Sequence, residues 1–141
     1  MKKVYLLLML VLTLFGCDNN VYHWKFNYDY EEIVEIKIIE MIDESEYREI
    51  KYVDLSLAKE IYEAISKLEM RRYGTNLSSQ NGICFLIVFS SGNYDIISQQ
   101  EPKHYIYTEG KIAAYNSWLY CDKSEYDALI NKYLNLNPEQ F

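Results

Sequence analysis

The sequence predicts an α+β fold, with one mostly antiparallel sheet of about five to six strands and two helices packed on it. Apolar residues alternate with a period of two in several short segments separated by turn residues, and two other stretches show a helical period. The elements follow in the order strand, strand, helix, three or four strands, helix. Such segregation of strands and helices is typical of α+β domains, whereas α/β domains alternate the two.

Aromatic and polar residues alternate at the start of the predicted domain. The aromatic members are Tyr22, Trp24, Phe26, Tyr28 and Tyr30. A period of two places all five rings on one face of an extended chain, which predicts a half-buried strand or a packed extended arm. The alternative is an aromatic belt at a membrane surface, where Trp and Tyr are enriched. Asp29 followed by Glu32 fits a capping box for a single helical turn at residues 30–33.

The next two segments are predicted to form a hairpin. In residues 34–40 the alternation puts apolar side chains on the inner face and charged ones outside. The inner residues are Val34, Ile36 and Ile38, and the outer ones are Glu35 and Lys37. An acidic break at residues 43–46 leads into residues 47–53, whose charges suit an edge strand.

A helical period begins at Asp54 or Ser56, either of which can cap the helix, and continues to about Glu69. Its apolar stripe consists of Leu57, Ile61, Ala64, Ile65 and Leu68. Arg71 and Arg72 follow the predicted helix. Cations near a helix C-terminus interact favourably with the helix dipole, and the alternative is that this pair binds an anion or a carboxylate.

The apolar run at residues 83–89 predicts a central strand covered on both faces. A tight reversal at residues 90–93 leads into residues 94–98, which is the strongest hairpin signal in the chain. Pro102 breaks the pairing. Residues 104–107 and 112–115 then form a further hairpin, which residues 118–120 complete or extend.

The second helix is predicted to begin after Asp122, with Glu125 at the N3 position of its capping box. Its apolar stripe consists of Tyr126, Leu129, Ile130, Tyr133 and Leu134. The α+β domain is therefore expected to span residues 22–135, and residues 136–141 are expected to form a loose tail.

The first 17 residues determine the expected location. Two lysines precede an apolar run at residues 4–15, and that run is shorter than the ~20 residues needed to span a bilayer. Leu14-Phe15-Gly16-Cys17 resembles the bacterial lipobox. This resemblance implies a signal peptide at residues 1–16, a diacylglyceryl group on Cys17, a tether at residues 17–21 and attachment to the extracytoplasmic face of the cell membrane. An ordinary secretory signal and an uncleaved anchor are the alternatives, and a cysteine directly after the apolar run favours the lipobox.

The net charge of the chain is −7, and removal of residues 1–16, with two lysines and no acid, would make it −9. Such a balance argues against nucleic acid as a partner, because phosphates require clustered Lys and Arg. It also argues against electrostatic attraction of the domain to anionic lipid, so the lipid on Cys17 is expected to attach the domain to the membrane. An acidic surface fits a cationic partner such as a basic peptide, a toxin or a metal ion, or serves only to keep the domain soluble.

No residue pattern predicts catalysis, a metal site or a cofactor. The two histidines, His23 and His104, are far apart in sequence and have no nearby nucleophile or metal-ligand spacing. A Cys–His pair with His104 is conceivable, but a buried thiol has a raised pKa and is inert. If Cys17 carries lipid, Cys84 and Cys121 permit one internal disulfide, and the alternative for Cys84 is a buried free thiol.

Tyrosine is the most unusual part of the composition, with 15 residues. We single out Tyr94, Tyr105, Tyr107, Tyr115 and Trp118 as a candidate partner-binding patch, because tyrosine supplies contact area at low entropic cost. Packing between neighbouring strands is the alternative explanation for these rings.

The whole organisation resembles small, uncharacterised bacterial lipoproteins in which a lipid tethers one compact α+β domain. The expected function is that of a non-enzymatic binding module at the cell envelope. The alternative is an immunity or inhibitor protein that sequesters a cationic toxin or enzyme.

Overall fold

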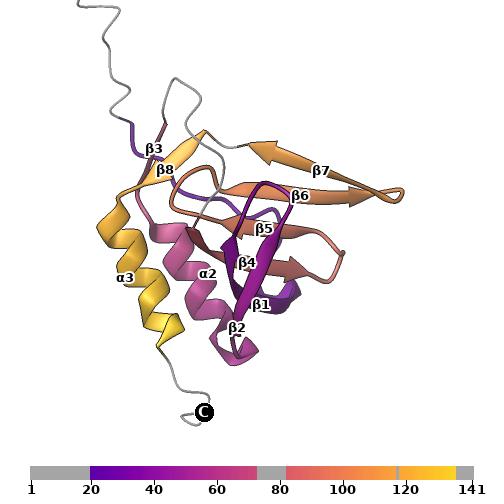
Figure 1. Ribbon diagram of the computed structural model, residues 1–141, viewed down its shortest axis with the longest axis horizontal. Helices are drawn as coiled ribbons and strands as arrows, with labels where there is room; N and C mark the ends of the chain where they lie inside the picture. The colour runs from indigo at the N-terminus through magenta and orange to yellow at the C-terminus, as the bar shows by residue number, and fades with distance from the viewer. Residues whose placement is uncertain (1–19, 73–81, 117, 136–141) are drawn as a thin grey trace, which may run out of the picture.

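The computed structural model describes residues 20–72, 82–116 and 118–135, which form an α+β fold with two helices on one face of an antiparallel sheet (Figure 1). The predicted fold class is therefore confirmed. The predicted signal peptide, Cys17 and the C-terminal tail lie outside the described residues.

The main sheet has six strands in the order β2-β1-β4-β5-β6-β7, and every neighbouring pair is antiparallel. Their bounds are β1 Ile33–Met41, β2 Tyr47–Tyr52, β4 Gly82–Phe89, β5 Tyr94–Ile97, β6 Lys103–Thr108 and β7 Lys111–Asn116. As predicted, β2 is an edge strand and β4 lies inside the sheet. The φ angles of Glu109 and Gly110, in the turn between β6 and β7, are both positive. Positive φ angles at both positions give a two-residue hairpin loop a twist that matches the twist of the strands.

The first strand differs from its prediction at two residues. Lys37 was expected outside, but it is 9% exposed and forms ion pairs with Glu35 and Glu49. Val34 was expected on the inner face, but 51% of it is exposed, while the preceding Ile33 is buried. The register between β1 and β4 shifts between Ile33 and Glu35. Because such a bulge places one extra residue in the strand, the alternation of faces changes at this point and Val34 points outward.

A second, two-stranded sheet pairs β3 (Met70–Arg72) with β8 (Leu119–Cys121). Residues 71 and 72 follow the helix as expected, but they form a strand that the sequence did not indicate. The prediction was wrong for residues 118–120, which do not extend the β6–β7 hairpin. The turn of chain after β7 carries a positive φ of 56° at Trp118, which directs the chain away from the hairpin and toward β3.

Both helices begin at aspartate caps. Asp54 accepts from the Ser56 N–H at the start of a 3₁₀ turn, η2 (Leu55–Leu57), which continues as α2 (Ala58–Lys67). Asp122 accepts from the N–H groups of Ser124 and Glu125 at the start of α3 (Lys123–Leu134). Both predicted caps are confirmed, although the regular α-helix α2 starts later and ends earlier than the sequence pattern indicated.

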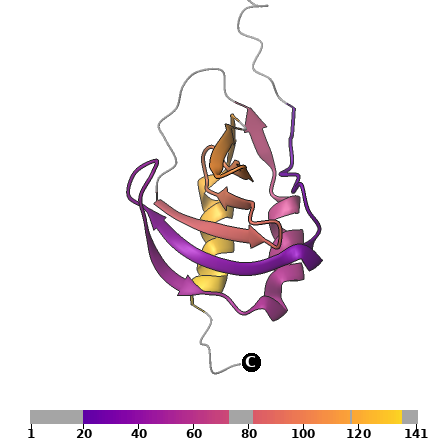
Figure 2. The same ribbon diagram turned by 90° about the vertical axis from the view of Figure 1, so that its right-hand side faces the viewer.

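The helices cover one face of the sheet and form the main core with it. Figure 2 shows that the sheet is strongly curved, most plainly along β1. The main core contains Ile36, Ile38, Phe85, Ile87 and Phe89 from the sheet, Ile61 and Ile65 from α2, and Tyr126, Ile130 and Tyr133 from α3. The opposite face of the sheet carries a smaller buried cluster of Ile39, Met41, Cys84, Leu86 and Ile96.

The aromatic segment at residues 20–29 is an extended arm, not a strand of the sheet. Its one ladder contact joins Tyr22 to Met70 of β3, through backbone hydrogen bonds of 2.8 Å in both directions. Trp24 is buried, and the rings of Tyr22, Phe26, Tyr28 and Tyr30 pack against the main core. The arm ends in a 3₁₀ turn, η1 (Tyr30–Glu32), where the Asp29 N–H donates to the Glu32 carboxylate as the capping box predicted. The packed-arm interpretation is therefore confirmed.

Candidate binding site

Two of the predicted binding tyrosines are structural. Tyr94 of β5 and Tyr105 of β6 are paired across the strands, and their rings stack in parallel with centroids 4.6 Å apart. They cover the smaller buried cluster on the face opposite the helices. Burial, followed by the neighbouring Tyr94 and Glu44, raises the pKa of Tyr105 to about 12. The alternative explanation, packing between strands, therefore accounts for this pair.

The other three predicted residues are exposed, but they do not form one patch with the first two. Tyr107 is 54% exposed and lies on the same face as Tyr105, where it pairs with Ile112 of β7. Tyr115 is 55% exposed and pairs with His104, so it lies on the other face of the sheet. Trp118 is 40% exposed and follows β7. The expected patch is thus divided between the two faces of the sheet.

The two described cysteines are free thiols in this structure. Cys84 belongs to the smaller cluster on one face of the sheet, whereas Cys121 belongs to the main core on the other. This separation explains why the structure contains no bond between them. Burial raises the pKa of each thiol to about 12, because the charged thiolate loses its hydration.

We expect neither Cys84 nor Cys121 to react with a maleimide in the native domain, because a buried, protonated thiol is a poor nucleophile. Both should be labelled once urea unfolds the chain. Mass spectrometry of the protein after timed labelling checks this prediction. Rapid native labelling at either position would mean that the cysteine is not buried as described.

Sequence reasoning did not identify a buried polar cluster that joins the arm to the sheet. The Asp95 side chain on β5 is 5% exposed, and its Oδ1 accepts a 2.8 Å hydrogen bond from Nδ1 of His104 on β6. Its Oδ2 accepts from the Trp24 indole N–H at 3.2 Å. The Trp24 and His104 rings stack with centroids 4.2 Å apart. One buried carboxylate therefore fixes two rings that come from separate parts of the chain.

A pocket of about 300 Å³ adjoins this cluster. Its walls come from the arm, from β3 and β8, and from the β6–β7 hairpin. The polar lining residues are His23, Lys25, Arg72 and His104, and the ring and apolar ones are Tyr22, Trp24, Tyr115 and Leu119. Of the residues predicted to bind a partner, only Tyr115 lines it. The signal that could have pointed here is Asp95, a carboxylate in a strand whose other residues are apolar, because a buried charge needs partners.

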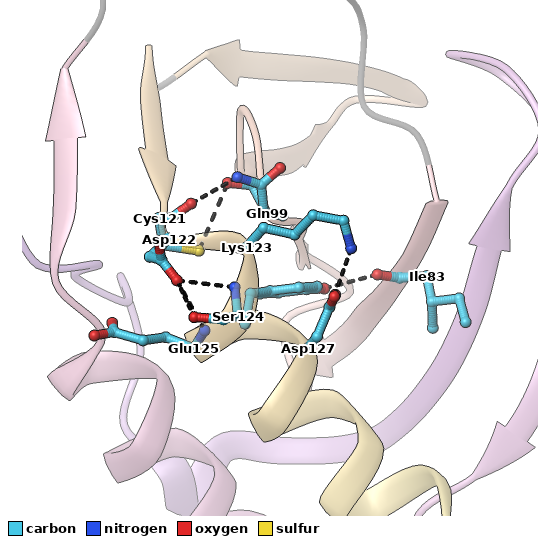
Figure 3. A network of polar contacts seen from close by, with 9 residues as sticks. Ile83, Gln99, Cys121, Asp122, Lys123, Ser124, Glu125 and Asp127 are labelled. Carbon is cyan, nitrogen blue, oxygen red and sulfur yellow. Dashed lines mark hydrogen bonds and ion pairs between the residues drawn. The ribbon is translucent and has the colours of Figure 1, made fainter.

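A second polar network holds the N-terminus of α3 against the sheet (Figure 3). The Gln99 amide donates to the Cys121 carbonyl at 2.6 Å, and the fully buried Tyr126 hydroxyl lies 2.8 Å from the carbonyls of both Ile83 and Ile97. Lys123 forms an ion pair with Asp127 one turn later. A pocket of about 350 Å³ lies beside these residues. Each polar group in the network has a partner within the fold, so its role is to position the helix.

In the part of the chain that the structure describes, no group of three or more His, Cys, Asp and Glu side chains is placed to hold a metal ion. None of the described helices has both the length and the apolar character to cross a bilayer. The chain matches no protein-family model, no curated protein and no solved structure.

Proposed function

We propose that this protein is a membrane-anchored lipoprotein whose α+β domain is a non-enzymatic binding module on the extracytoplasmic face of the bacterial cell membrane. The lipobox-like sequence ending at Cys17 supports the anchor. Two acyl chains on this cysteine would hold the domain firmly, whereas a single chain gives marginal binding. The partner is a protein or a cationic peptide.

The observation that carries the binding role is the exposure of large apolar side chains at the β6–β7 hairpin. This hairpin projects from the body of the domain, and β7 is an edge strand (Figure 1). The exposed side chains are Tyr107 and Ile112 on one face of the hairpin, Tyr115 on the other face, and Trp118 after β7, with exposed fractions between 40% and 57%. Aromatic residues at such positions supply much of the binding energy of protein interfaces.

Replacement of Cys17 by serine tests the anchor. We expect the wild-type chain to lose residues 1–16, gain the mass of acyl chains and sediment with membranes, because a lipobox cysteine receives the lipid. The Cys17→Ser chain should gain no acyl mass. Intact-protein mass spectrometry and membrane fractionation measure both properties. Equal cleavage and equal solubility of the two chains would contradict the anchor.

Alanine substitutions at the hairpin test the binding surface. We expect Tyr107→Ala and Tyr115→Ala each to weaken partner binding by roughly 1 kcal/mol or more, because they remove exposed rings without opening the core. Their urea midpoints should stay close to that of the wild type. Pull-down from envelope extracts, followed by titration with the captured protein, measures the effect.

A matched control is Tyr52→Ala, which removes an equally exposed ring, at 62%, from the opposite edge strand β2. This variant should bind as the wild type does. Unchanged binding in Tyr107→Ala and Tyr115→Ala would place the contact surface elsewhere, and equal loss of binding in all three variants would show that the effect is not specific to the hairpin.

The second candidate function is an immunity or inhibitor protein that sequesters a cationic toxin or enzyme. The acidic balance of the chain, 21 acids against 14 bases, favours it. In this case a basic protein should co-purify at low salt and dissociate as salt screens the contact. Salt-insensitive binding that the hairpin variants abolish would support the apolar surface instead.

A further inference from the structure

We infer that the pocket between the arm and the β3–β8 sheet binds a phosphate-bearing organic anion. Two of the residues that line this pocket, Lys25 and Arg72, are cationic. Within residues 20–72, 82–116 and 118–135, no carboxylate lines the pocket, and neither cation forms an ion pair. A pocket with this charge, in a protein of net charge −7, is selective for anions.

The Arg72 side chain is held in place without its hydrogen-bond donors being used by a carboxylate. Its guanidinium carbon lies 5.1 Å from the centroid of the Tyr22 ring, which is a cation–π contact. A guanidinium in this position still presents planar N–H groups, and their fork matches the oxygens of a phosphate. Arg71 differs, because it lines another pocket together with Glu69, Asp122 and Glu125.

Both imidazoles of the pocket are oriented by a hydrogen bond at Nδ1. His104 donates to Asp95, and His23 donates to the Leu68 carbonyl at 3.0 Å. In a neutral ring that donates through Nδ1, Nε2 is a hydrogen-bond acceptor, so the donors for an anion come from Lys25 and Arg72 and not from the imidazoles. Asp95 itself does not compete with an anion, because its side chain is buried and its two oxygens already accept from His104 and Trp24.

The rest of the lining favours an anion that is carried on an organic group. Trp24, Tyr115 and Leu119 contribute ring and apolar surface, and the volume of about 300 Å³ lies at the small end of ligand pockets. Two positive charges beside such a surface, one of them held by the Tyr22 ring, fit a phosphate ester better than a bare ion or a larger nucleotide.

The pocket also lies close to the proposed lipid. Tyr22 follows Cys17 by five residues, so an extended chain allows at most about 18 Å between their Cα atoms. If the proposed function holds and Cys17 is acylated, the pocket lies within reach of phospholipid headgroups. The phosphate has two available sources, a headgroup of an anionic phospholipid or a soluble phosphate ester, and these can be separated experimentally.

The first experiment titrates the full chain, purified in a nonionic detergent, with glycerol 3-phosphate at low ionic strength. Calorimetry measures the affinity, and the indole N–H resonance of Trp24 reports occupancy of the pocket. We expect saturable binding, and we expect the double variant Lys25→Gln, Arg72→Gln to weaken it about tenfold or more. This titration does not require the anchor, so its failure is distinguishable from failure of the proposed function.

The matched control is Lys67→Gln, Arg71→Gln, which removes the same two residue types from outside the pocket. Arg71 precedes Arg72 on the same strand, so the side chains point to opposite faces. The control variant should keep wild-type affinity. Absence of saturable binding, or equal weakening by the two double variants, would overturn the inference.

The second experiment places the acylated chain in vesicles of phosphatidylcholine alone and of phosphatidylcholine with phosphatidylglycerol. A shift of the Trp24 resonance in the second vesicles only, absent in the Lys25→Gln, Arg72→Gln variant, identifies the headgroup as the source. If the resonance is the same in both vesicles and shifts only on addition of glycerol 3-phosphate, the ligand is a soluble ester.

Discussion

Replacing Trp24 by alanine is expected to lower the free energy of unfolding by about 3–5 kcal/mol, the usual cost of removing a buried large aromatic ring. Trp24 is 3% exposed, stacks on His104 and donates to the buried Asp95 carboxylate. The substitution therefore opens a cavity and also removes one partner of a buried charge. Because small domains are stable by about 5–15 kcal/mol, much of the population should unfold at moderate urea concentrations. Urea denaturation followed by circular dichroism measures the change.

The control is the second tryptophan. Trp118 is 40% exposed, so Trp118→Ala should cost less than about 1 kcal/mol. Trp24→Phe should fall between these limits, because it retains a ring but leaves Asp95 without the indole donor. Near-equal stabilities of Trp24→Ala and the wild type would contradict the packed arm.

The free energy of unfolding should also decrease steeply as the pH rises from 9 toward 12. Burial raises the pKa of Cys84 and of Cys121 to about 12 in the folded domain, from an ordinary value of 9.0. Above pH 9 the unfolded chain therefore binds fewer protons than the folded chain, and stability is lost as the pH increases. Each thiol contributes up to about 1.4 kcal/mol per pH unit in this range. Urea midpoints at pH 8, 9.5 and 10.5, in the presence of a reductant, measure the slope.

The variant Cys84→Ala, Cys121→Ala provides the comparison for this slope. It should start from a lower stability at pH 8 but lose less with each pH unit, because two of the titrating groups are absent. Part of the decline in the free energy of unfolding should remain above pH 10, because burial also raises the pKa of Tyr126. Parallel slopes for the variant and the wild type would show that the thiols do not control alkaline stability.

The elements that could be predicted from sequence are those with long or regular hydrophobic patterns. Residues 83–89 are apolar throughout, and β4 is covered on both faces, by the main core and by the smaller cluster. The alternating rings of residues 22–30 indicated one buried face, and the arm has one. Periodicity predicts burial here, but not whether the extended chain gains a neighbouring strand.

The elements that could not be predicted are short or depend on distant partners. β3 and β8 have three residues each, too few to show a period, and their backbone partners are distant in the chain. The outward position of Val34 comes from a bulge, which shifts the alternation by one residue without a mark in the pattern.

The candidate site was beyond sequence reasoning for a similar reason. Asp95 and His104 come together through the register of β5 with β6, and Trp24 is 71 positions away from Asp95 in sequence. Each of the three residues has an ordinary role when considered alone. Among the residues predicted to bind a partner, Tyr107 and Tyr115 are exposed, whereas Tyr94 and Tyr105 are not. The register of the strands determines this difference, and no local sequence pattern specifies the register.

The arm determines how mechanical load enters the domain. A pull on the chain before Asn20 reaches the Tyr22–Met70 backbone pair before the hydrogen bond of His23 to Leu68. Only after these contacts separate does tension reach the Trp24 ring and the carboxylate beneath it. Since the contacts follow one another along the chain, they would yield one at a time, and the pocket would lose a wall before the sheet lost a strand.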